Sequence, residues 1–119
     1  MHNFVGLIGR LTDNPELKKY DEGKTRLSIN LAVQRDYKSE DGLYGTDFIR
    51  CVLWNGIANH VNEYCHKGDL LAVKGRLQSR SYEENEEKKY ISEVIVDRVS
   101  FLSSRADQTT QESSIEIVE

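Results

Sequence analysis

Hydrophobic and polar residues alternate along most of this chain with the two-residue period of a β-strand. In RLSINLAVQR (residues 26–35) the apolar side chains fall on one face and the polar side chains on the other. Each alternating stretch is amphipathic rather than continuously apolar, which favours an antiparallel sheet. The predicted strands cover residues 4–11, 26–35, 47–54, 72–82 and 90–102.

One segment has helical periodicity instead. In NGIANHVNEYCHKG (residues 55–68) apolar residues recur at the spacing of one helix face. Asn55 is expected to cap the N-terminus of this helix, and Gly68 to end it. The stretches 12–17, 21–24, 38–45 and 83–89 are polar and contain glycine, proline or charge runs, so they are predicted to be turns and loops.

This order of elements predicts an all-β domain with one helix. Five short strands around a small core close most economically as a barrel, and a helix between strands three and four is typical of the five-stranded OB fold. An SH3-like barrel or an open sheet with one helix would give the same order of elements. The domain is predicted to cover residues 1–102.

Length and composition restrict the number of domains, the use of disulfides and the expected location of the protein. At 119 residues the chain is long enough for one core. Cys51 and Cys65 are too few for a disulfide framework and suit a reducing compartment. With no transmembrane-length apolar run and no signal-peptide pattern, a cytoplasmic location is expected. Residues 103–119 carry three of the four net negative charges and are expected to form a short, acidic, disordered tail.

The strand AVKGRLQSRSY (residues 72–82) has an unusual face for an acidic chain. One side carries Lys74, Arg76, Gln78, Arg80 and Tyr82, with no acidic residue among them. A solvated strand face usually mixes charges of both signs. This face therefore predicts an anionic partner.

Aromatic residues accompany the cations on the neighbouring strands. Arg35 and Tyr37 end the second strand, and Phe48, Arg50 and Trp54 share one face of the third. If these faces adjoin, cations can contact phosphates while flat rings stack on bases, whatever the base sequence. A duplex, whose bases are already stacked, would gain little. The pattern predicts binding to single-stranded nucleic acid.

Other interpretations stay open at this point. Trp54 could equally belong to the core, since an amphipathic strand needs large apolar residues somewhere. An OB barrel could use its aromatics to bind protein, and stacking would also accept RNA. An enzyme is disfavoured because no zinc-type spacing of cysteine or histidine and no nucleophile–base pair is present. No metal, cofactor or catalytic residue is predicted.

The sequence resembles the bacterial-type single-stranded DNA-binding proteins over residues 3–102. VGLIGRLTDNPELK, LSINLAVQRDY, DFIRCVLWNG, the helix ending in KGD, and GRLQSRSY carry the similarity. The resemblance implies an OB fold that binds single-stranded DNA as a homotetramer, without catalysis. It also implies stacking and phosphate-binding residues at matching motif positions. These are Tyr37, Phe48, Trp54 and Tyr82 for stacking, and Lys18, Arg35, Arg50, Arg76 and Arg80 for phosphates, to which the strand pattern adds Lys74.

The chain departs from the family pattern in three places. Lys19 stands where an aromatic usually follows the cation in the PEL segment, and EENEEKK places four glutamates in the last hairpin. The tail ends IEIVE, without the usual acidic Pro-Phe tip, so recruitment of replication and repair enzymes through it is not expected. These departures suggest a short-tailed paralogue or a phage- or plasmid-encoded form. The expected setting is DNA replication, recombination, repair or uptake at the nucleoid.

Overall fold

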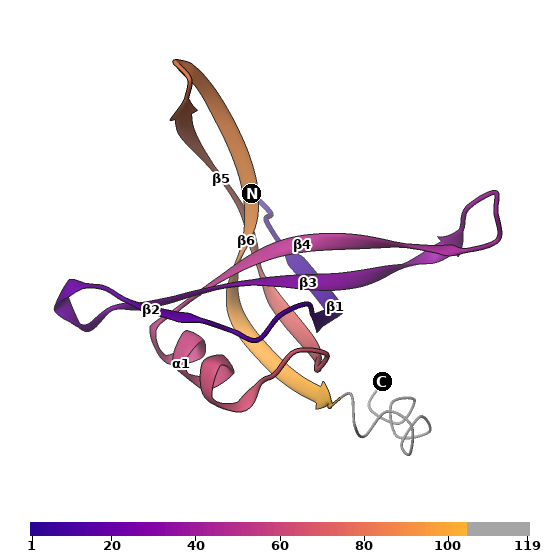
Figure 1. Ribbon diagram of the computed structural model, residues 1–119, viewed down its shortest axis with the longest axis horizontal. Helices are drawn as coiled ribbons and strands as arrows, with labels where there is room; N and C mark the ends of the chain where they lie inside the picture. Colours follow the sequence, from indigo (N-terminus) through magenta and orange to yellow (C-terminus); the bar gives the residue numbers. More distant parts are fainter. Residues whose placement is uncertain (105–119) are drawn as a thin grey trace.

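A computed structural model describes residues 1–104 of the chain (Figure 1). Strands dominate, and a single α-helix of ten residues occurs in this part of the chain. No helix within it has the length and apolar character needed to cross a membrane. The elements are β1 (Val5–Leu11), β2 (Leu17–Lys19), a 3-10 turn (Asp21–Gly23), β3 (Thr25–Lys38), β4 (Tyr44–Trp54), α1 (Asn55–Tyr64), β5 (Leu70–Glu84) and β6 (Glu87–Ser103).

The strands close into a barrel. The sheet order is β1-β5-β6-β4-β3-β2, and β1 also pairs with β3 at Arg10 and Leu11, which joins the two ends. Five strands, β1, β3, β4, β5 and β6, therefore form the barrel, which confirms the predicted OB fold. The antiparallel prediction is wrong for one pair, because β4 and β6 run parallel where Cys51 and Val52 face Val94 and Ile95.

Strand β2 was not predicted. Its three residues pair with the start of β3, with Leu17 opposite Leu27. Three residues are too few to show an alternating pattern, and two of the three are lysines. With β2 counted, the helix lies between β4 and β5, which is its predicted place between the third and fourth barrel strands.

Two hairpins extend well beyond the barrel as long arms (Figure 1). Strands β3 and β4 continue into the segment 38–45 that was predicted to be a loop, and β5 and β6 pair as far as Glu84 and Glu87. Asn85 and Glu86, the two residues between them, both have positive φ (53° and 65°), as a tight two-residue hairpin turn requires. The ladder thus runs through polar sequence that contains no apolar alternation.

The helix differs from its prediction at both ends. Asn55 is the first helical residue rather than the cap, and its side-chain oxygen accepts a hydrogen bond from the backbone N–H of Thr25 (3.2 Å). Helix α1 ends at Tyr64, four residues before Gly68. Gly68 instead adopts a φ of 91° in the next turn, where its N–H donates to the carbonyl of Leu11 (2.8 Å).

The core fills the inside of the barrel. Alternate residues of the barrel strands point inward, and α1 adds Ala58 and Val61 to the same cluster. Both cysteines are buried and free. Burial raises the pKa of the Cys51 thiol to about 12. The largest fully buried side chains are Leu27, Leu31, Leu53, Leu71, Val52, Val61, Val94 and Cys51.

Candidate nucleic-acid interface

One outer surface of the barrel spans β3, β4, β6 and β5. Val52 of β4 is opposite Ile95 of β6, which in turn is opposite Arg76 of β5. Residues opposite one another in a ladder point to the same side of the sheet. The even-numbered residues of β4 and β5 therefore lie on one surface, called here the outer face. It carries Phe48, Arg50 and Trp54 from β4 and Arg76, Gln78, Arg80 and Tyr82 from β5.

A buried carboxylate lies at the centre of the outer face. The two oxygens of Glu93 accept hydrogen bonds from Nε of Arg50 and Nε of Arg80, each at 2.9 Å. The Glu93 side chain is only 3% exposed, whereas the two arginines are 39% and 43% exposed. Sequence reasoning missed this residue. An acid between Ile91 and Ile95 on one strand face was the signal that could have revealed it.

Trp54 lies at the end of the outer face next to β2 and β3. The residue is 41% exposed, so the core interpretation of Trp54 is wrong. Arg26 lies opposite it in the ladder, with its guanidinium carbon 5.7 Å from the indole centroid, and the ring of Tyr20 is 6.3 Å away. Lys18, opposite Arg26, extends this row of residues. Arg26 and Tyr20 had not been predicted as site residues.

A hollow of about 190 Å³ adjoins this row. It is lined by Glu16, Lys18, Arg26, Ser28 and Arg50. Three cations surround one carboxylate there, so the hollow is predominantly positive. It connects the Trp54 end of the outer face with the Glu93 centre.

The remaining aromatics follow the arms. Phe48 is 69% exposed and lies opposite Ala32, a small neighbour that leaves the ring uncovered. Tyr82 is 41% exposed near the end of the β5–β6 arm, and Tyr37 is 61% exposed near the end of the β3–β4 arm. Because the two arms point in different directions (Figure 1), these rings are spread over a long path rather than gathered in one pocket.

Arg35 does not join the outer face. It makes a 2.7 Å ion pair with Asp47, which neighbours Phe48 along β4 and so points to the opposite side of the strand. The Arg35 hydrogen bond lowers the pKa of Asp47, and the same contact raises the pKa of Arg35. Val33 lies opposite Asp47, and Arg35 follows Val33 by two residues, so alternation alone places Arg35 on the same side of the sheet as Asp47. The β3–β4 register shifts between Gln34 and Lys38, so alternation could not locate Tyr37.

Lys74 lies around the barrel from Trp54, where β5 meets β1. It is opposite Gly6, and its Nζ is 5.3 Å from the ring centroid of Phe4. Most of the predicted residues therefore lie on the outer face, with Lys74 at its edge where β5 meets β1, whereas Arg35 lies off this face. Lys18 lies at the border of the outer face.

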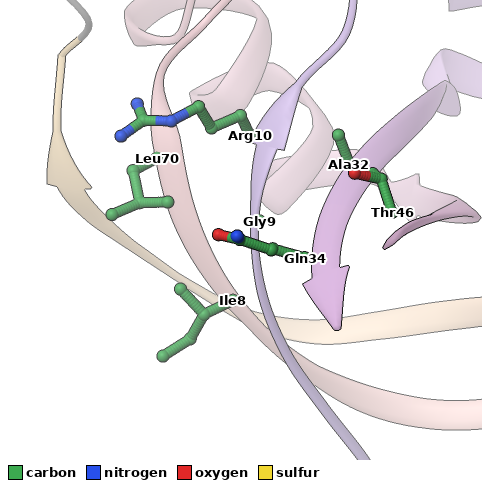
Figure 2. Close-up of a pocket in the computed structure, with 7 residues that line it drawn as sticks. All are labelled: Ile8, Gly9, Arg10, Ala32, Gln34, Thr46 and Leu70. Carbon is green, nitrogen blue, oxygen red and sulfur yellow. The ribbon is translucent and has the colours of Figure 1, made fainter. Parts of the chain in front are cut away.

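A larger hollow of about 420 Å³ opens where β1 and β3 separate (Figure 2). Arg10 and Gln34 are among its polar side chains, and Ala32 joins it to the outer face beside Phe48. The Arg10 guanidinium donates to the carbonyl of Gly68 (2.8 Å). The hollow is lined by Ile8, Gly9, Arg10, Ala32, Gln34, Thr46 and Leu70.

Residues 1–104 contain no cluster of three or more histidine, cysteine or carboxylate side chains that could hold a metal ion. The interface thus consists of exposed rings and guanidinium groups on a sheet. Such an arrangement can bind a flexible polyanion that carries flat bases.

Comparison with known proteins decides the family. The model of the single-strand binding protein family matches residues 2–102. The chain belongs to this family. The resemblance inferred from the sequence motifs is therefore confirmed, and the match covers the barrel strands, except the last residue of β6, and all residues of the outer face.

Individual relatives agree with this family assignment. The chain is 39% identical over 117 residues to a single-stranded DNA-binding protein of Halalkalibacterium halodurans, covering 98% of this chain and 70% of that protein. It is 41% identical over 107 residues to single-stranded DNA-binding protein B of Bacillus subtilis, covering 88% and 94%. A solved structure of the Plasmodium falciparum SSB complex with ssDNA aligns with a TM-score of 0.78 at 28% identity, covering 87% of this chain and 96% of that one.

Proposed function

We propose that this protein binds single-stranded DNA without regard to base sequence and protects it. The observation that carries the proposal is the outer face, where Phe48, Trp54 and Tyr82 share one surface with Arg50, Arg76 and Arg80. The family supports it, since the relatives are named for single-stranded DNA binding and the solved neighbour is a complex with ssDNA. The function is binding and not catalysis.

Affinity would come from two sources. Guanidinium and ammonium groups neutralise phosphates, which makes binding weaken as salt rises. Exposed rings stack on bases, each contributing about 1–3 kcal/mol to the binding free energy. Stacking requires unpaired bases, so it supplies the preference for single strands over duplex. We assign stacking to Trp54, Phe48, Tyr82 and Tyr37, and phosphate contacts to Arg50, Arg76, Arg80, Lys18, Lys74 and Arg35.

The assignments differ in what supports them. Arg50, Arg76 and Arg80 share the outer face with exposed rings, whereas Arg35 must leave Asp47 before it can meet a phosphate. Arg26 and Tyr20 join the assignment because both contact Trp54. We place Arg26 with the phosphate-binding group and Tyr20 with the stacking group.

The wider setting is also part of the proposal. Family membership favours a homotetramer acting on cytoplasmic, nucleoid DNA during replication, recombination, repair or uptake. Ser103, the first residue of the predicted tail, is the last residue of β6, and the tail from residue 105 onward lies outside the described residues. Bound to a strand, such an assembly would keep it from re-pairing and shield it from nucleases.

The test uses the fluorescence of Trp54, because the chain has one tryptophan. Titration with oligo(dT) is expected to quench this signal, less at high salt, while a duplex of the same length leaves it unchanged. Oligo(U) in parallel measures any RNA binding. No quenching together with no retention on single-stranded DNA would refute the proposed function and favour a protein-binding role for the aromatics.

A further inference from the structure

Glu93 occupies the middle of a surface that should attract phosphate, although its own charge repels it. Its carboxylate is 3% exposed, and each oxygen accepts one hydrogen bond, from Arg50 on β4 and from Arg80 on β5. We propose that Glu93 is a positioning residue for phosphate binding. It holds both arginines by Nε and turns their terminal NH₂ groups toward the DNA backbone. This inference rests on the proposed function and assigns a new role within the same site.

The hydrogen-bonding capacity of the arginines supports this role. A guanidinium has five N–H donors in one plane, and only the one on Nε is engaged by Glu93. Within residues 1–104 neither Arg50 nor Arg80 donates to any other side chain. Four donors on each arginine therefore stay available on side chains that are about two-fifths exposed.

Fixing a long side chain before the ligand arrives raises affinity. A flexible arginine must lose its rotational freedom when it binds phosphate, which weakens binding by a factor of about 2–13 for each side chain. Glu93 restricts both arginines in the free protein. It also compensates two like charges, on β4 and β5 either side of β6, which would otherwise repel one another.

A simple electrostatic role predicts the opposite effect of mutation. If Glu93 acted only through its charge, removing it would strengthen binding to a polyanion. If it served only to hold β4 and β5 together across β6, its loss would lower stability but leave the salt dependence of binding unchanged. Affinity, salt slope and melting temperature together separate these roles from positioning.

The experiment measures binding of the full chain to labelled oligo(dT) by fluorescence anisotropy at several salt concentrations. Glu93→Asp keeps the charge but shortens the side chain by one methylene, so it cannot reach both arginines. We expect its affinity to fall about tenfold, from the loss of two restrained side chains. Because two phosphate contacts loosen, the slope of log K against log salt should become shallower by up to ~1.4.

Two further variants control for charge. Glu16→Gln removes a negative charge from the hollow beside Arg50, and Glu16 makes no hydrogen bond or ion pair with the described residues. Its affinity should rise or stay the same. Glu93→Gln removes the same charge from the outer face, yet the proposal expects its affinity to fall, because an amide can accept from only one of the two arginines.

Several outcomes would overturn the inference. It fails if Glu93→Asp binds DNA as tightly as the wild type, or if Glu93→Gln binds more tightly than the wild type. It also fails if the Glu93 variants differ from the wild type only in melting temperature. If both Glu93 variants unfold, the proposal can still be tested on the wild type by observing the Nε–H NMR signals of Arg50 and Arg80. These should persist when DNA is added, and their loss would contradict the proposal. Failure of the wild type to bind oligo(dT) would instead refute the proposed function itself.

Discussion

Arg26 lies over the indole ring of Trp54, with the guanidinium carbon 5.7 Å from the ring centroid. The two residues are opposite one another in the β3–β4 ladder, so the register of the sheet fixes their contact. Tyr20 is also close to the ring, yet 41% of Trp54 stays exposed. The ring is thus held in place with surface left for a base.

The first prediction concerns Trp54 itself. Trp54→Ala should weaken binding to oligo(dT) about 5- to 150-fold, which corresponds to the loss of one stacked base. Trp54→Phe keeps a ring and should lose much less. Anisotropy of a labelled oligonucleotide measures both variants, and unchanged affinity in a folded Trp54→Ala protein would show that no base stacks on this ring.

The second prediction concerns Arg76, which lies on the outer face with its Nη1 donating to the side-chain oxygen of Gln78 (2.7 Å). Removing one phosphate contact from a single-strand complex should make the slope of log K against log salt shallower by ~0.7. Arg76→Ala should show this change. Lys67→Ala is the matched control, since Lys67 lies in the turn after α1 and should leave the slope unaltered. Equal slopes for wild type and Arg76→Ala would place Arg76 outside the DNA path.

The sequence predicted the barrel strands and the location of the single helix, because inward and outward residues alternate wherever a strand borders the core. It also predicted the correct strand face for Phe48, Trp54, Arg76 and Arg80. Alternation within one strand carries this information without knowledge of its neighbours.

Other features depend on pairing between strands, which the sequence pattern does not contain. The pairing of Val33 with Asp47 places Asp47 within reach of Arg35, and a three-residue strand brings Lys18 and Tyr20 to the Trp54 end. The Glu93 contacts join three strands, so they appear only when β4, β6 and β5 are assembled.

The third prediction concerns thiol reactivity. The pKa of Cys51 is raised to about 12 by burial, and burial together with the nearby Asp69 carboxylate raises the pKa of Cys65. Thiolate is the reactive form, so raised pKa values keep both thiols neutral near pH 8. Neither should react with Ellman's reagent in the folded protein, whereas both should react in denaturant. Rapid labelling of native protein at pH 8 would contradict the burial of these side chains.

The raised thiol pKa values also determine the direction in which the free energy of unfolding changes with pH. The contribution of Cys51 is fully present below the pKa of the unfolded thiol, roughly 8.5. It is lost as the pH rises from there toward about 12, because the unfolded chain ionises first. Cys51→Ala should reduce this loss, and comparing the denaturant midpoints of wild type and variant at pH 7.5 and pH 10 would measure the difference.

The last prediction concerns the bulge where β5 and β6 change register. Gly75 is opposite Val96, and its neighbour Lys74 is opposite Arg98, so β6 has one extra residue at this point. A Cβ on Gly75 would overlap the backbone carbonyl oxygen of Ile95. The obstructing atom belongs to the backbone, which cannot swing aside as a side chain would. Gly75→Ala must therefore separate the two strands at the bulge.

We expect Gly75→Ala to lower the free energy of unfolding by more than about 2 kcal/mol, at the upper end of overpacking effects. For a domain of this size, that loss would lower the melting temperature by roughly 8–16 °C. Gly6→Ala is the matched control, because a Cβ there meets no atom within 4 Å, and it should change stability by less than about 1 kcal/mol. Both variants must be melted at equal protein concentration, since association would shift the midpoint. If the two variants melt alike, the close approach of β5 to β6 at Gly75 is wrong, and with it the register that brings Arg76 and Arg80 to the outer face.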